Sequence, residues 1–170
     1  MKSDGVICVS NNTLSDLKYF YPNYKKPIKV IYNGKSNDYK QLNSVNKNNT
    51  ILFVGSRVDY KNFEYAVKLT SNLNDYIFII VGGGDLTSNE LRILEHNLPN
   101  KYRIVGNIKN EDLNKMYNEA FFLLYPSSMK ALLNSLLSKL RQQVVLSYVA
   151  IYLQYQKLLV MLPFTSPVMI

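Results

Sequence analysis

Glycine and basic residues occur together directly after an apolar segment in the first third of the sequence. Gly55, Ser56 and Arg57 follow the run 51–54, and Lys61 comes four residues after Arg57. Glycine allows a sharp backbone turn after a strand, and the free amide groups at the start of a following helix attract anions. Arginine binds phosphate through a forked pair of donors, and lysine through a point charge. The spacing favours a diphosphate site at this turn; the alternative is a set of surface charges around a tight turn.

More glycines follow the next two apolar runs. Gly82, Gly83 and Gly84 come after residues 76–81, and Gly106 comes after residues 102–105. Three successive glycines let a ligand approach the backbone closely, although they do not form the GxGxxG fingerprint. Ligands of open parallel sheets bind beyond the carboxyl ends of the strands, so we expect these loops to line one site.

Other kinds of chemistry lack the residues that they need. With His96 as the only histidine and Cys8 as the only cysteine, the chain has no set of ligands for a structural zinc and no internal disulfide. A single histidine also gives no basis for a Ser/His/Asp arrangement. From the residues alone we assign no catalytic residue and no metal site.

Apolar runs and helical patterns alternate along the chain. Strands are expected over 5–9, 29–32, 51–54, 76–81, 102–105 and 120–125, and helices over 14–20, 62–73, 86–98 and 111–118. Thr13 is expected to cap the first helix, and 35–49 to form a solvated connection. Strands joined by helical crossovers predict an α/β fold, with half of a doubly wound parallel sheet of Rossmann type.

Composition narrows the classes of protein. The chain has 170 residues, of which 47% are hydrophobic and 19% charged, and this excludes disorder caused by too few apolar groups. The formal net charge is +8, but residues 129–170 contain four basic and no acidic residues, so residues 1–128 carry 16 basic and 12 acidic ones. This distribution argues against a nucleic-acid-binding protein. Because no signal peptide opens the chain, we expect a cytoplasmic protein.

Five segments occur in the order and with the spacing of a known family: 3–17, 25–35, 51–62, 78–85 and 102–128. Together they resemble the retaining GT-B-fold glycosyltransferases, a large group that includes bacterial mannosyl- and glucosyltransferases. The resemblance implies transfer of a sugar from a nucleotide-sugar donor to a glycan or lipid-linked acceptor in polysaccharide biosynthesis. It implies no cofactor and no essential metal, and it admits peripheral association with the inner face of the membrane.

The resemblance also divides the chain. It implies that residues 1–34 form the end of the acceptor-side domain and the interdomain connection, and that 35–128 begin the nucleotide-sugar-binding domain. Lys61 stands where the family places a lysine on the donor diphosphate. The Gly82–Gly84 and Gly106 loops resemble those that line the nucleotide. The family often has arginine directly after the first glycine, where this chain has Ser56.

Residues 129–170 depart from the family. After the segment that ends here at Ser128, the family continues with Glu-Gly-Phe-Gly-x-Pro-x-x-Glu-Ala, whose carboxylates contact the donor sugar and ribose. Shifting the codons of residues 129–131 by one base forces a glutamate and permits Tyr-Glu-Gly-Phe after Ser128, and later codons permit further family segments in order. We therefore interpret 129–170 as an out-of-frame tail, helical or irregular, on a truncated and inactive copy. The alternative is a genuine amphipathic helix followed by a tail.

Two other functions stay open. The chain could be a non-catalytic nucleotide- or anion-binding module that keeps only the site around Gly55, Arg57 and Lys61. It could also be a basic membrane-associated protein that relies on its cationic tail, with binding that depends steeply on salt.

Overall fold

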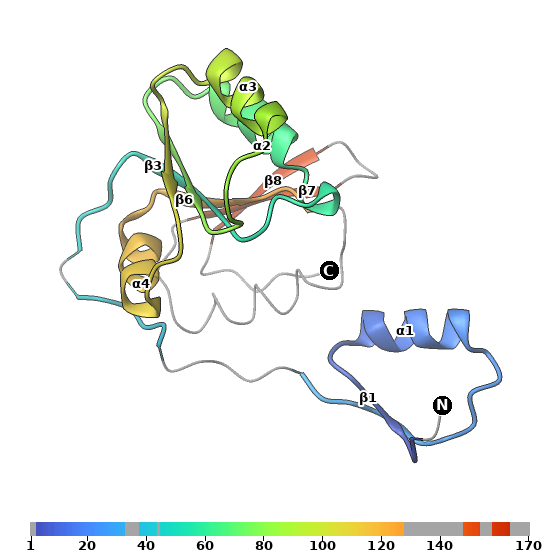
Figure 1. Cartoon of the computed structure of the whole chain (residues 1–170). Coiled ribbons are helices and arrows are strands. Elements are labelled where there is room, and N and C mark those ends of the chain that lie inside the picture. The colour runs from blue at the N-terminus through green and yellow to red at the C-terminus, as the bar shows by residue number, and fades with distance from the viewer. Residues whose placement is uncertain (1–2, 33–37, 44, 128–147, 154–157, 164–170) are drawn as a thin grey trace.

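The computed structural model of the chain describes residues 3–32, 38–43, 45–127, 148–153 and 158–163 (Figure 1). These residues form two sheets, one of two strands and one of six. Among them, no helix has both the length and the apolar character needed to cross a bilayer.

The two-stranded sheet belongs to a small β–α–β unit near the N-terminus. Its elements are β1 (Val6–Cys8), α1 (Asn11–Phe20) and β2 (Ile28–Val30), and the strands pair in parallel. The cap of α1 differs from the expectation, because the Ser10 side chain, rather than Thr13, accepts the hydrogen bond at the helix start. The backbone N–H of Thr13 is the donor, at 3.1 Å, so the helix begins earlier than the apolar pattern indicates.

The six-stranded sheet has the order β5-β4-β3-β6-β7-β8. All neighbouring strands are parallel except β7 and β8. Its strands are β3 (Thr50–Val54), β4 (Ile77–Val81), β5 (Tyr102–Val105), β6 (Phe122–Tyr125), β7 (Tyr148–Leu153) and β8 (Leu158–Pro163). Between them lie η1 (Asp59–Lys61), α2 (Phe63–Ser71), α3 (Ser88–Asn97) and α4 (Asn110–Glu119). This arrangement confirms the expected α/β, Rossmann-like fold.

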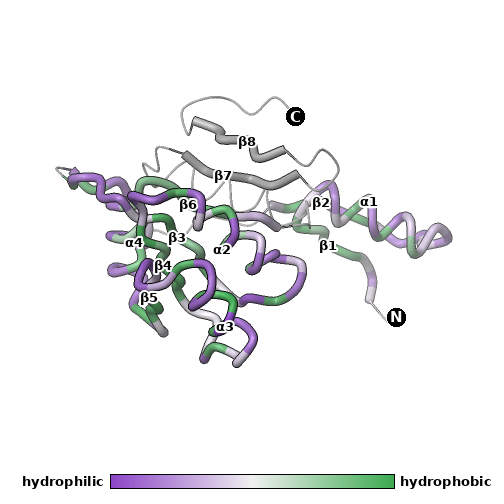
Figure 2. Tube along the Cα trace, turned by 90° about the horizontal axis from the view of Figure 1, so that it is seen from above, coloured by the Kyte–Doolittle hydropathy of each residue, from purple (hydrophilic) through white to green (hydrophobic). Residues whose placement is uncertain are grey.

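Helices cover both faces of this sheet, because successive side chains of a strand point to opposite faces. On one face Ile51 and Phe53 pack with buried residues of α2 and α3, such as Val67 and Leu94. On the other face Leu52 packs with residues of α4. In Figure 2 the apolar strands accordingly lie between α4 on one side and α2 and α3 on the other. Strands that are buried on both faces read as continuous apolar runs, which is why the sequence showed them.

The expectation that residues 129–170 are helical or irregular is wrong for the part of this tail that the structure describes. Residues 148–153 and 158–163 form β7 and β8 instead of a helix or irregular chain, and β7 extends the sheet beside β6. The segment Tyr-Val-Ala-Ile-Tyr-Leu is rich in aromatic and β-branched residues, which favour strands. The stretches 128–147, 154–157 and 164–170 lie outside the described residues, and so does the alternative amphipathic helix over 129–140.

The segment before β3 is more ordered than the expected solvated connection. Lys40 N donates to Asn114 Oδ1 at 2.9 Å, and Leu42 N donates to Asn118 Oδ1 at 3.0 Å. Asn118 Nδ2 returns a bond to Lys40 O at 3.0 Å. Asparagines spaced four residues apart on α4 therefore hold this segment through its backbone groups. One turn earlier on α4, Asn110 bonds side chains of the same segment: its Oδ1 accepts from Tyr39 Oη at 3.1 Å and its Nδ2 donates to Asp38 Oδ2 at 2.8 Å. We call the set Asn110, Asn114 and Asn118 the asparagine ladder.

Candidate functional site

The turn after β3 brings Lys61 over Gly55. Gly55 has φ +106°, a conformation that favours glycine, and its N–H donates to Val81 O at 2.8 Å, which holds the turn against β4. A Cβ at Gly55 would lie 2.5 Å from Lys61 Nζ, so the missing side chain leaves room for the ammonium group. Burial lowers the pKa of Lys61, because the charged form loses water.

Asn62 connects this turn to the end of β6. It adopts a left-handed conformation with φ +49°, and its Nδ2 donates to Pro126 O at 2.8 Å. The Asn62 backbone then begins α2 directly after the short helix that carries Lys61. Asn62 was not among the predicted site residues; its position directly after Lys61, where a left-handed turn tolerates asparagine, was the available signal.

The glycines after β4 form a left-handed loop around Arg57. Gly82, Gly83 and Gly84 have φ values of +75°, +85° and +75°. A Cβ at Gly83 would lie 2.6 Å from Arg57 Nη1 and 2.9 Å from Gly55 O. Glycine at this position is therefore required both by the backbone conformation and by the close approach of its neighbours.

Arg57 has protein partners on most of its guanidinium. Nη1 donates to Gly82 O at 3.0 Å, and Nη2 donates to the carbonyl oxygens of Gly83, Gly84 and Asp85 at 3.2, 3.1 and 2.7 Å. Its side chain is 3% exposed. Arg57 was expected to make a forked contact with phosphate, whereas in the structure its donors point to backbone carbonyls of the neighbouring loop.

Glu90 completes the environment of Arg57. Its Oε1 accepts from Arg57 Nε at 2.9 Å, and its Oε2 accepts from Thr87 N at 2.7 Å in a capping box at the start of α3. Burial raises the pKa of Glu90, but the hydrogen bonds from Thr87 and the charge of Arg57 outweigh burial and lower the pKa below its ordinary value. Glu90 was not among the predicted site residues, although the spacing Thr-x-x-Glu was a signal for the capping box.

The predicted site residues thus fall into two groups. Gly55, Arg57, Lys61, Gly82 and Gly83 come together at the carboxyl ends of β3 and β4. The other two, Ser56 and Gly106, are exposed beside this group, and the loop of Gly106 is joined to it by a bond from Gly82 N to Val105 O at 2.9 Å.

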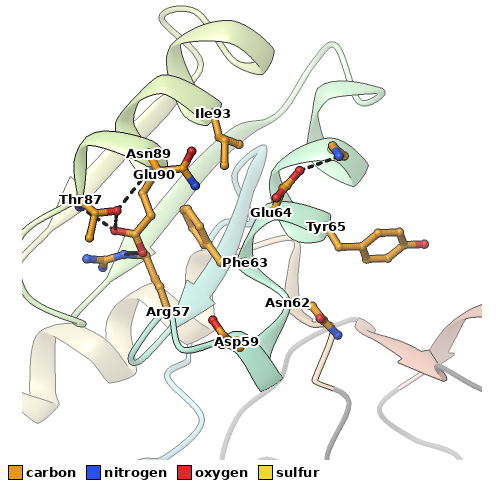
Figure 3. Close-up of a pocket in the computed structure, with 11 residues that line it drawn as sticks. Arg57, Asp59, Asn62, Phe63, Glu64, Tyr65, Thr87, Asn89, Glu90 and Ile93 are labelled. Carbon is orange, nitrogen blue, oxygen red and sulfur yellow. Dashed lines mark hydrogen bonds and ion pairs between the residues drawn. The ribbon is translucent and has the colours of Figure 1, made fainter.

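A pocket of about 590 Å³ lies between the first turns of α2 and α3 (Figure 3). Arg57 and Glu90 contribute to one wall, and Asp59, Glu64 and Lys68 also line it. Three acidic residues and two basic ones line the pocket, and both basic residues are paired with carboxylates, Lys68 with Glu64 at 2.7 Å and Arg57 with Glu90 at 2.9 Å. This pocket is less suited to a diphosphate than the space over Gly55. Within the described part of the chain, no group of three or more His, Cys, Asp or Glu residues could hold a metal ion.

A sequence model of the family described as "Glycosyl transferases group 1" matches residues 34–134. No curated protein sequence matches the chain.

Three solved structures illustrate the likeness in fold. TarM superposes with a TM-score of 0.68 at 15% identity, over 91% of this chain and 30% of TarM. WaaG, a glycosyltransferase involved in lipopolysaccharide biosynthesis, superposes with a TM-score of 0.65 at 16% identity, over 79% of this chain and 41% of WaaG. Alr3699/HepE from Anabaena, solved in complex with UDP-glucose, superposes with a TM-score of 0.56 at 16% identity, over 75% of this chain and 39% of HepE. The chain therefore spans well under half the length of these proteins, and the likeness shows the fold alone.

Proposed function

The chain belongs to the glycosyl transferases group 1 family, and from this membership we propose that it binds the diphosphate of a nucleotide-sugar donor at Lys61. In the whole protein the sugar would pass to a glycan or lipid-linked acceptor. The complex of HepE with UDP-glucose supports a nucleotide-sugar as the ligand class. The neighbouring Gly82–Gly84 and Gly106 loops, at the carboxyl ends of β4 and β5, would line the nucleotide.

The observation that carries this proposal is a half-buried cation, Lys61, that has no counterion within the part of the chain that the structure describes. Among the described residues, no carboxylate or other acceptor pairs with Lys61 Nζ, although burial already lowers its pKa. A buried charge without a partner is costly, and an arriving anion removes that cost. Preorganised cations of this kind also stabilise a departing diphosphate during sugar transfer.

The test is a titration of the 170-residue chain with UDP, GDP and ADP in a calorimeter. Lys61→Ala is expected to lower the affinity for the nucleotide that binds best by about tenfold or more, since a hydrogen bond to a charged group contributes about 1.5–3 kcal/mol. Lys68→Ala is the matched control, because Lys68 is exposed and paired with Glu64. Equal affinity of Lys61→Ala and the wild type would contradict the proposal.

We further propose that the chain as it stands binds a donor without transferring its sugar. Residues 129–170 contain no Asp or Glu, so this tail cannot offer the carboxylates that the family places on the donor sugar and ribose. The division into 1–34, 35–128 and an out-of-frame 129–170 is part of the same proposal. Release or transfer of glucose from UDP-glucose by the purified chain, above the rate without protein, would overturn it.

A cytoplasmic location at the inner face of the membrane is also proposed, since a lipid-linked acceptor would be found there. The end of α1 supports this location, because Tyr19, Phe20 and Tyr21 are exposed there beside Lys18. Exposed aromatic rings and lysines suit the interface of an anionic bilayer. The chain should co-sediment with vesicles that contain phosphatidylserine and less with the Phe20→Ser variant; equal sedimentation with neutral vesicles would contradict membrane binding through charge.

A further inference from the structure

The loop from Gly82 to Asp85 is held by one side chain. Each of its four carbonyl groups accepts a hydrogen bond from the guanidinium of Arg57, at distances between 2.7 and 3.2 Å. Among the described residues, no backbone acceptor pairs with the N–H groups of Gly83 and Gly84. Those N–H groups are therefore available to an anionic ligand.

A loop of three glycines depends on such an anchor. Glycine loses more conformational entropy on ordering than any other residue, and all three glycines here hold the left-handed conformation. A guanidinium offers five donors spread over a fixed plane, whereas an ammonium group offers three donors from one nitrogen atom. Only arginine at position 57 can bind the whole row of carbonyls in one orientation.

Arg57 is itself fixed in place. Its Nε is paired with Glu90 at 2.9 Å, and Glu90 is in turn held by Thr87 through the capping box of α3. On the other side the Arg57 guanidinium carbon lies 5.9 Å from the centre of the Phe63 ring. With its side chain 3% exposed and its donors engaged, Arg57 has little freedom to turn toward a ligand.

We propose that Arg57 is a positioning residue for donor binding, which acts by ordering the Gly82–Asp85 loop, while Lys61 is the cation that touches the diphosphate. This inference rests on the proposed donor site. It separates two basic residues whose close spacing suggests one shared role.

The first arm of the test measures the loop without ligand. Backbone ¹⁵N relaxation of the full chain should give rigid order parameters, about 0.85, for Gly83 and Gly84 in the wild type and values below about 0.6 in Arg57→Gln. Arg92→Gln is the matched control, because Arg92 is exposed and its hydrogen bond goes to Asn89 of its own helix. Unchanged order parameters in Arg57→Gln would overturn the proposal.

The second arm measures affinity for UDP, GDP and ADP. Arg57→Gln and Arg57→Lys should both weaken binding by about tenfold, since lysine keeps the charge but cannot hold the row of carbonyls. Wild-type affinity in Arg57→Lys together with weaker binding in Arg57→Gln would indicate that the charge contacts phosphate directly, and would overturn the proposal. Unchanged affinity in both variants would also overturn it, because Arg57 would then have a merely structural role. Should Arg57→Gln not fold, Glu90→Gln is expected to give the same changes to a smaller degree, and no change in either measurement would overturn the proposal. Failure of the donor-binding proposal gives a different result from failure of the Arg57 proposal. In that case the wild type would bind none of the three nucleotides, whatever the order parameters show.

Discussion

In Lys61, burial and charge act against each other. Burial lowers the pKa of its amino group, and a bound diphosphate would raise the pKa again by stabilising the charged form. In the free protein the buried charge destabilises the fold at neutral pH, and this penalty disappears as pH rises through the lowered pKa toward that of an ordinary lysine. Ligand binding should therefore take up protons in the alkaline range between the free and the bound pKa, and none at neutral pH.

The measurement is the binding enthalpy of the nucleotide in buffers of different ionisation enthalpy. Proton uptake should be present in the wild type at alkaline pH and absent in Lys61→Met. Uptake of equal size in both proteins would show that another group titrates.

At Gly83 the left-handed backbone disfavours a side chain, and a Cβ would also approach a backbone atom, Gly55 O, at 2.9 Å. Gly83→Ala should lower the free energy of unfolding by about 1–2 kcal/mol from the left-handed conformation alone, and by more if Arg57 is displaced. Gly106→Ala is the matched control, since its Cβ would meet nothing within 4 Å and its φ is not positive. Urea unfolding of the two variants compares them, and equal stability would contradict the structure of the loop.

The sequence predicted the arrangement of the site residues only in part. The types and spacing of Gly55, Arg57 and Lys61 indicated that basic groups meet near a turn, and the structure does bring them together. The sequence could not show that the Arg57 side chain turns toward another loop. The carbonyls of Gly82–Asp85 lie more than 20 residues away along the chain, and backbone carbonyls carry no signal in residue type. Glu90 was missed for the same reason, since its bond to Arg57 spans 33 positions.

Among the elements, the asparagine ladder of α4 supplies stability that the apolar pattern does not show. Asn118 is 3% exposed and bonds the backbone of both Lys40 and Leu42. Asn118→Ala would remove the partners of the Leu42 N–H and the Lys40 C=O, which are partly buried, and leaving such a group unpaired costs up to about 1–3 kcal/mol. We expect a lower unfolding free energy and faster proteolysis within residues 38–49.

Lys115→Ala serves as the control for the ladder. Lys115 lies on the same helix, is 66% exposed and is paired with Glu119 only at 3.7 Å, so its loss should change stability by less than about 0.5 kcal/mol. Equal effects of the two substitutions would show that the ladder contributes nothing.

Strands and helices were predictable where one apolar pattern governs them. The runs at β3, β4 and β6 are buried on both faces, so their continuous apolar character identified them. Boundaries and connections were not predictable in the same way. The start of α1 depends on the Ser10 side chain, and the order of residues 38–42 depends on asparagines more than 70 positions away.

The whole molecule joins a family-like sheet to a tail of different composition. The tail adds β7 in parallel to β6 and β8 antiparallel to β7, so strand-forming residues extend the sheet even though no acidic residue occurs among 129–170. Parallel pairing needs a crossover of a dozen or more residues, and the chain between β6 and β7 is long enough for one. Sheet formation and donor chemistry therefore make different demands on this region: the first needs apolar strands, and the second needs carboxylates.

This difference predicts the effect of restoring the reading frame. A chain encoded with one base inserted after the codon of Ser128 should regain a Glu-Gly-Phe segment, and its carboxylates can accept hydrogen bonds from the hydroxyls of ribose and sugar. Each such bond to a charged group contributes about 1.5–3 kcal/mol, so affinity for UDP-glucose should rise by about tenfold or more over the 170-residue chain. Calorimetry measures this change, with a chain that stops at Ser127 as the control, which is expected to bind no better than the 170-residue chain. A gene whose shifted frame encodes serine instead of glycine after this glutamate, or a restored chain that binds UDP-glucose no more tightly, would contradict the interpretation of residues 129–170 as an out-of-frame tail.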